Sequence, residues 1–199
     1  MSGDNSKNKQ WRARTIVKRE AATVPLSQQL IVCAVFCALA VAVILQFHRQ
    51  PDVAAVVRGL PLIYQTLIGV TFGALYWVAS LLGARFIARR KSAQHIAQSY
   101  SRLDLSGWNP LWIALAAGFG EELFFRGALQ PLMGIWLTSI LFVLAHIRAY
   151  RFKTLDKRVL LQAFSIFSIS IFFGFVAHYA GLITAMIVHA AMDVVSLYF

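Results

Sequence analysis

The sequence predicts an all-α membrane protein, a polytopic bundle of about six transmembrane helices, and two observations support this prediction. Of the 199 residues, 59% are hydrophobic and only 14% are charged, whereas a soluble domain is about 45–50% apolar. The apolar residues also gather in runs that match the roughly 20 residues a helix needs to cross a bilayer. The chain has room for such spans and for no separate soluble domain.

Each predicted span is an apolar run bounded by a polar, proline or glycine break. The first run exceeds the roughly 7–15 residues of a signal-peptide core and is therefore expected to remain in the protein. Pro131 is expected to open the fourth span, because proline is favoured in the first turn of a helix. The six runs are Leu26–Phe47, Leu60–Ala84, Leu111–Leu129, Pro131–Ile147, Val159–Tyr179 and Leu182–Phe199.

Two pairs of residues inside these runs are expected to serve helix packing. Gly69 and Gly73 have the GxxxG spacing that lets two helices approach closely. Cys33 and Cys37 lie one helical turn apart within the first run, where small apolar side chains pack. Neither a disulfide framework nor a cysteine metal site is predicted.

The formal net charge of +11 is concentrated in three stretches, residues 7–19, 85–102 and 148–158, each beside an apolar run. They hold six, five and five of the 19 Lys and Arg. With six spans all three stretches fall on one side of the membrane, so the positive-inside rule places both termini in the cytoplasm. This pattern indicates membrane topology and argues against nucleic acid as a partner. Part of the second stretch can form an amphipathic surface helix.

Six polar residues lie inside the predicted spans, at a cost of about 2.5–3.5 kcal/mol for each acid or arginine at a helix centre. They are Glu121, Glu122, Arg126, His146, His189 and Asp193. One explanation is structural: such groups pair with one another and hold helices together. The other is functional, because ionisable groups within a membrane mark reaction sites and ion pathways.

The spacing of these residues separates their expected roles. Glu122 and Arg126 are four residues apart, so they can form an ion pair along one helix. Glu121 lies about 100° around the helix from Glu122 and lacks that partner, which makes it a candidate general base. His189 and Asp193 also lie four residues apart, so the carboxylate can orient the imidazole or share a ligand with it.

The same residues form three motifs in order along the chain. These are EExxxR with Glu121, Glu122 and Arg126, FxxxH with Phe142 and His146, and HxxxD with His189 and Asp193. In order and spacing they resemble the motifs of the CPBP family (CAAX protease and bacteriocin-processing, also called Abi), which includes the type II CAAX prenyl endopeptidases. The resemblance implies a catalytic core of four transmembrane helices over residues 108–199. Residues 1–25 form a polar basic segment before it, and residues 26–107 form two helices and a basic cytoplasmic loop.

The resemblance implies an intramembrane endopeptidase in which Glu121 and His146 activate water while His189 and Asp193 stabilise the oxyanion. Glu122, Arg126 and Phe142 are expected to support them. A glutamate-type, metal-independent site is favoured, so no cofactor is expected. The alternative is Zn²⁺ held by the same four catalytic residues. In the family that the motifs resemble, Asn is commoner than Asp at the position of Asp193. An ionised Asp cannot donate a hydrogen bond, whereas Asn can.

Two other functions remain open: a non-catalytic scaffold or immunity protein of the same family, and a proton-coupled carrier. The expected partners are the lipid bilayer and a membrane-bound peptide or protein substrate. The short chain suggests a prokaryotic inner (plasma) membrane. His48, His95 and His178 are expected to be solvated or interfacial rather than catalytic.

Overall fold

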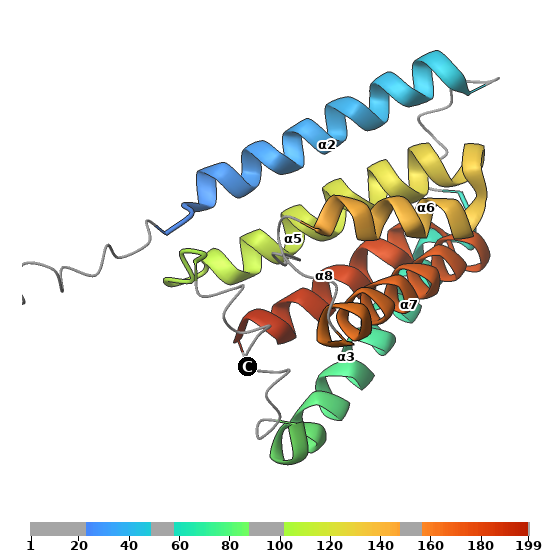
Figure 1. Cartoon of the computed structure of the whole chain (residues 1–199). Helices are drawn as coiled ribbons and strands as arrows, with labels where there is room; N and C mark the ends of the chain where they lie inside the picture. The colour runs from blue at the N-terminus through green and yellow to red at the C-terminus, as the bar shows by residue number, and fades with distance from the viewer. Residues whose placement is uncertain (1–22, 49–57, 88–101, 148–156, 199) are drawn as a thin grey trace, which may run out of the picture.

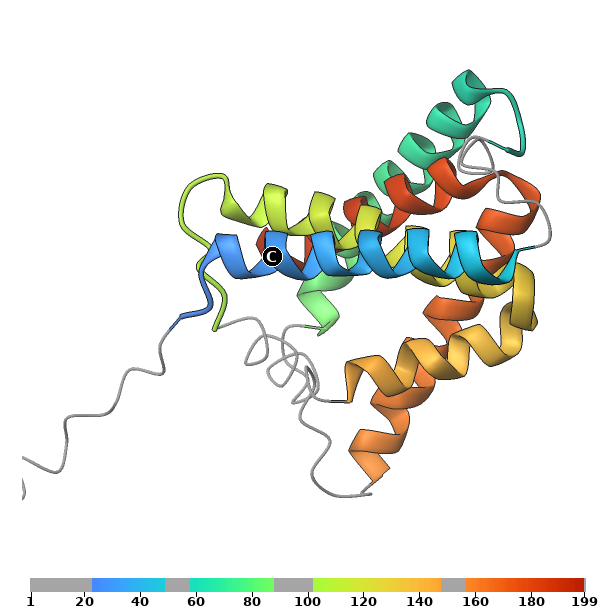
Figure 2. The same cartoon turned by 90° about the horizontal axis from the view of Figure 1, so that it is seen from above.

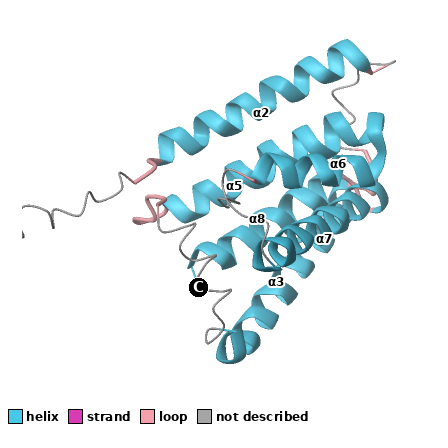
Figure 3. Ribbon diagram, in the orientation of Figure 1, coloured by secondary structure: helices cyan, strands magenta, loops and turns pink. Residues whose placement is uncertain are grey.

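The structure, a computed structural model, describes residues 23–48, 58–87, 102–147 and 157–198. Every named element in these ranges is a helix, and two isolated bridges pair Val24 with Leu103 and Gly59 with Gly181 (Figure 3). The all-α prediction is therefore confirmed. The elements are α2 (Leu26–Phe47), α3 (Leu62–Ile87), α5 (Asn109–Glu122), the π-helical segment η2 (Leu123–Leu129), α6 (Gln130–His146), α7 (Lys157–Tyr179) and α8 (Leu182–Tyr198).

Four helical stretches are long and apolar enough to cross a membrane, and α8 is a shorter apolar helix. They are Leu26–Phe47, Leu62–Gly83, Asn109–His146 and Val159–Tyr179. Large apolar side chains point outward from them, with 62% of Leu45, 69% of Leu82 and 67% of Phe164 exposed. An exposed apolar surface of this kind is typical of contact with lipid. The chain is an integral membrane protein.

The third of these stretches reverses direction at Gly134 rather than at Pro131. The helical backbone continues through Pro131, which lies in the first turn of α6, and the break comes at Gly134 with φ 75° and ψ 172°. A positive φ is costly for any residue with a Cβ, so glycine allows the chain to fold back. Figure 2 shows α6 returning alongside η2. Helix α6 therefore begins with Pro131 in its first turn, as predicted, and the reversal comes about one helical turn later.

A π-helical turn joins α5 to α6. The backbone N–H of Gln130 donates to the carbonyl of Phe125, five residues earlier. Segments with this wider hydrogen bonding are rare and are often found at functional sites. Here the segment carries Arg126 and directly follows Glu122, the last residue of α5.

Helix α8 packs against α3, α5 and α7, and α2 packs against α5 and η2. Figure 1 shows α2 and α3 on opposite sides of the bundle. The GxxxG glycines explain the contact between α3 and α8, because a Cβ on Gly73 would lie 2.7 Å from the Cβ of Ala191 and one on Gly69 would lie 2.8 Å from that of Ile187. The predicted packing role of the two glycines is confirmed.

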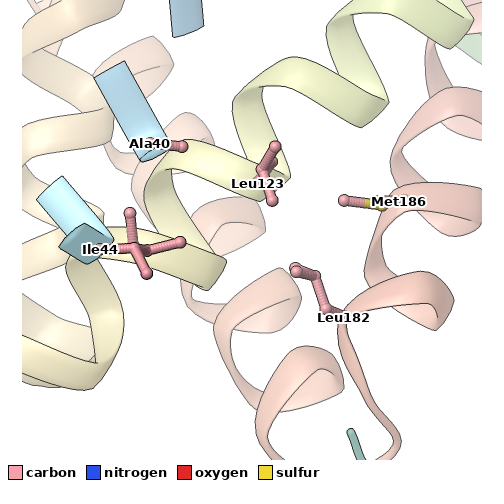
Figure 4. Packing of buried hydrophobic residues seen from close by; sticks show 6 residues of the cluster. Ala40, Ile44, Leu123, Leu182 and Met186 are labelled. Atoms are coloured by element: carbon pink, nitrogen blue, oxygen red, sulfur yellow. The ribbon is translucent and has the colours of Figure 1, made fainter. Parts of the chain in front are cut away.

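An apolar cluster joins α2, η2 and α8 (Figure 4). Its labelled members are Ala40, Ile44, Leu123, Leu182 and Met186, each at most 9% exposed. Cys37 packs against this cluster, as expected for a small apolar side chain. The cluster fixes the positions of the helices that carry the polar residues.

The start of α2 and the segment before α5 meet at one end of the bundle. The N–H of Val24 donates to the carbonyl of Arg102 at 2.6 Å, and the N–H of Asp104 donates to the carbonyl of Val24 at 3.0 Å. Most of the three basic stretches lies outside the described residues, as do His95 and Phe199. The predicted amphipathic surface helix also lies largely outside them.

Candidate active site

The predicted ion pair between Glu122 and Arg126 is buried within the bundle. Arg126 Nε donates to Glu122 Oε2 at 3.2 Å, and neither side chain has solvent exposure. Arg126 Nη2 also donates to the hydroxyl of Ser170 on α7 at 2.8 Å. The ion pair predicted from the spacing is therefore present, and it is tied to a second helix.

Glu122 has a second partner on α8. His189 Nδ1 lies 2.8 Å from Glu122 Oε1. A carboxylate paired with arginine can only accept a hydrogen bond. Nδ1 therefore carries a proton and donates a hydrogen bond to Glu122. The other ring nitrogen, Nε2, lies 3.6 Å from Asp193 Oδ2. Glu122 and Asp193 therefore lie at opposite nitrogens of one imidazole.

Glu121 and His146 form a second carboxylate–imidazole pair. His146 Nε2 lies 3.5 Å from Glu121 Oε2, with 19% and 16% of the two side chains exposed. His146 Nδ1 lies 2.8 Å from the carbonyl oxygen of Phe142 and donates to it. This hydrogen bond places a proton on Nδ1, so in the neutral imidazole the Nε2 lone pair is directed towards Glu121.

Aromatic rings hold both imidazoles in place. Phe142 stacks on His146 with ring centres 4.3 Å apart and an interplanar angle of 27°. Phe173 stacks on His189 at 4.7 Å and 16°. The guanidinium of Arg126 lies 5.4 Å from the centre of the Phe142 ring, within cation–π range. Phe142 thus contacts His146 on one side and the guanidinium of Arg126 on the other.

Both imidazoles, Glu121 and Asp193 face a cavity of about 430 Å³ between the helices. Its lining includes all four predicted catalytic residues, which come from α5, α6 and α8. It also includes Val24, Arg102 and Leu103, at the end of the bundle where α2 and α5 begin. The structure therefore brings together residues up to 72 positions apart in the sequence.

The same four residues are not placed as a set of metal ligands. Among the described residues, no group of three or more His, Cys, Asp or Glu side chains is positioned to hold a metal ion. The zinc alternative stays a prediction, and the mechanism proposed below uses no metal.

The histidines excluded by the sequence analysis lie apart from the cavity where they are described. His48, after the last turn of α2, donates from Nε2 to the carbonyl of Ala128 at 2.9 Å and so ties α2 to η2. This structural contact was not predicted. His178 is exposed and meets Tyr179 edge-on at 4.8 Å.

Sequence analysis missed three contacts of the site: Glu122 with His189, Arg126 with Ser170, and the stacking of Phe173 on His189. Each joins residues on different helices. Helical spacing predicts neighbours on one helix and says little about its partners. The one available signal was the serine itself, a hydroxyl inside an apolar run that carries no motif.

These features define a class: a helical membrane protein with a polar cavity lined by two carboxylate–imidazole pairs. Residues 104–195 match a protein-family model described as type II CAAX prenyl endopeptidase Rce1-like. The resemblance predicted from the three motifs is thereby confirmed for this region, and the family is one of proteases. No curated protein and no solved structure matches the chain significantly.

The hydrogen bond from Arg126 to Ser170 gives a first testable prediction. Ser170→Ala should lower the free energy of unfolding by about 1.5–3 kcal/mol, because it removes a hydrogen bond to a buried charged group. Ser168→Ala is the matched control on the same helix, since that side chain is exposed and bonds only its own helix at Phe164. Unfolding in detergent measures both variants. Equal stabilities would show that the contact contributes nothing.

Proposed function

We propose that the protein is an intramembrane endopeptidase that hydrolyses a peptide bond of a membrane-associated or lipidated protein or peptide. The observation that carries this proposal is the pair of Glu121 and His146, 3.5 Å apart at the wall of a water-accessible cavity. The family match over residues 104–195 supports it. A carboxylate and an imidazole at this distance can both contact one water molecule.

In the proposed first step, Glu121 accepts a proton from this water molecule. The oxygen of the water attacks the carbonyl carbon of the substrate at the same time. His146 Nε2 faces the same position and accepts a hydrogen bond from the water, because its proton is on Nδ1. The proton on Glu121 then passes to the leaving amine as the C–N bond breaks. Water is consumed, and the products are a carboxylic acid and an amine.

The negative charge on the carbonyl oxygen is proposed to be stabilised by His189 and Asp193. Glu122 accepts from His189 Nδ1 and favours an imidazolium that carries a second proton on Nε2. Nε2 can then donate to the oxyanion. Asp193 donates only when protonated, so simultaneous donation by His189 Nε2 and Asp193 requires a proton on each of them.

The helices are proposed to cross the membrane six times, with α6 counted from the turn at Gly134 and α8 as the last span. The pairing of Val24 with Leu103 supports this arrangement, because it brings the starts of α2 and α5 to one end. The basic stretches adjoin that end, so it is proposed to face the cytoplasm. The cavity would then open to the cytosol of a prokaryotic inner membrane.

Cleavage assays on purified protein test the function. Glu121→Gln should slow cleavage of membrane-tethered or lipidated peptides by about 10²–10⁴-fold, because it removes the proposed base. His146→Ala should act in the same direction, whereas His178→Ala, an exposed histidine far along α7, should leave the rate unchanged.

The same assay distinguishes the competing functions. Cleavage that a chelator abolishes would restore the zinc alternative. Absence of cleavage by folded wild-type protein over the whole peptide panel would favour the non-catalytic scaffold. Proton-coupled uptake into liposomes without any cleavage would favour the carrier.

Position 193 permits a sharper test of oxyanion stabilisation. Asp193→Asn should retain activity or increase it, since the amide donates a hydrogen bond without needing a proton. Asp193→Leu should reduce kcat by about 10²–10³-fold, the usual effect of losing one oxyanion donor. Initial rates at saturating substrate measure both. An equal loss in the two variants would instead assign Asp193 a role that requires its charge.

Cysteine labelling tests the orientation. Ser106→Cys lies in an exposed turn at the cavity end of the bundle, and Tyr179→Cys lies at the opposite end, where Tyr179 is 73% exposed. A membrane-impermeant maleimide added to intact cells should label only the second variant. Wild type, with its half-buried Cys33 and Cys37, gives the background. The reverse pattern would refute the cytoplasmic placement.

A further inference from the structure

Gln29 on α2 faces the site although it lies outside the three motifs and outside the family match. It is half-buried, whereas its neighbours Gln28 and Leu30 are exposed. Ala40 and Ile44 are the buried residues of α2, and they follow Gln29 by close to whole numbers of helical turns. Gln29 therefore lies on the face of α2 that points into the bundle.

The contact between α2 and α5 brings Gln29 close to Glu121. A Cβ on Gly120 would lie 3.0 Å from Cys33 Sγ and 3.1 Å from Cys33 Cα, so the two helices touch at this glycine. The helices start at the same end of the bundle. Gln29 lies one turn before Cys33, as Ala117 lies one turn before Glu121, so Gln29 packs beside this part of α5.

A second, smaller cavity of about 30 Å³ lies at this contact. Gln29 and Glu121 line both the small cavity and the large one, while Cys33 lines the small one and His146 the large one. A buried water needs roughly 10–15 Å³ and at least two polar partners. The small cavity is large enough for one water molecule. Its polar partners would be the Gln29 carboxamide, the Glu121 carboxylate and the Cys33 thiol.

One carboxylate oxygen of Glu121 can accept a further hydrogen bond. Its buried Oε2 has no hydrogen-bond partner among the described residues, and it lies 3.5 Å from His146 Nε2. Leaving a buried acceptor unpaired costs about 1–3 kcal/mol. A carboxamide one helix away can supply a donor from Nε2, directly or through water.

We propose that Gln29 is a positioning residue for Glu121. Its carboxamide, together with one water molecule in the small cavity, hydrogen-bonds the Glu121 carboxylate from the side away from His146. This holds the carboxylate towards the large cavity, where the attacking water binds. The effect of this contact on catalysis rests on the proposed protease function. The hydrogen bond itself does not depend on that function.

Gln29→Met tests the role, because methionine has a similar shape and cannot form the hydrogen bond. Gln28→Met is the matched control on the exposed face. In the Gln29 variant kcat should fall about 10–100-fold, as for other residues that orient a reacting group, with KM unchanged. The control should keep the wild-type kcat. A wild-type kcat in Gln29→Met, or a loss confined to KM, would overturn the positioning role.

Infrared spectroscopy tests the contact without any cleavage. The Glu121 carboxyl band is identified by its loss in Glu121→Gln, and it should shift in Gln29→Met but not in Gln28→Met. An unshifted band rejects the contact whatever the activity. A shifted band in a protein that cleaves nothing supports the contact and rejects only the protease function. If Gln29→Met does not fold, Gln29→Ala should give the same shift and the same loss of kcat.

Discussion

The site depends on one carboxylate that has no exposure to solvent. Glu122 accepts hydrogen bonds from Arg126 and His189, and Arg126 donates in turn to Ser170. This network joins α5 and η2 to α7 and α8. A charged group without water is costly unless it is paired, and breaking a buried pair typically costs about 3–5 kcal/mol. The helices are therefore held in the one arrangement that keeps Glu122 satisfied.

The position of Glu121 follows from that of its neighbour. Because successive side chains on a helix point about 100° apart, fixing Glu122 towards Arg126 and His189 turns Glu121 towards the large cavity. The π-helical segment η2 then separates two kinds of contact. Phe124 and Phe125 meet Phe36 of α2 at 5.4 and 5.9 Å, while Arg126 reaches α7. A short helical irregularity thus allows one segment to pack apolar rings on one side and a cation on the other.

The sequence predicted the parts of the site that lie on single helices. The pairs Glu122–Arg126 and His189–Asp193 follow from the four-residue spacing. The resemblance to a known family predicted that His146 belongs to the same site. Contacts between helices were not predictable in this way, because they depend on crossing points. The contact of Glu122 with His189 requires α5 and α8 to meet closely at Gly118, where a Cβ would lie 2.8 Å from the Ala190 nitrogen.

The chain reversal at Gly134 could not be predicted for a related reason. Proline often marks the end of a helix, but Pro131 lies in the first turn of α6. Proline is tolerated in a first helical turn. The reversal needs a positive φ, and among the residues nearby Gly134 meets that need at low cost. In an apolar run the pattern of polarity gives no further information, because both sides of the turn are hydrophobic. Only the packing of α6 against η2 distinguishes the two positions.

The distribution of the acids follows from access to water. Glu122 has no solvent exposure and is paired with a cation, whereas Glu121 and Asp193 are partly exposed and face the cavity. A carboxylate without an arginine or lysine partner is tolerable within a membrane protein where it faces a water-filled cavity. The walls of this cavity include Val24 and Gln29 of the N-terminal region and Tyr76 of α3, all outside the family match. The first two helices therefore do more than anchor the chain, because without them the carboxylates that face the cavity would lie against lipid.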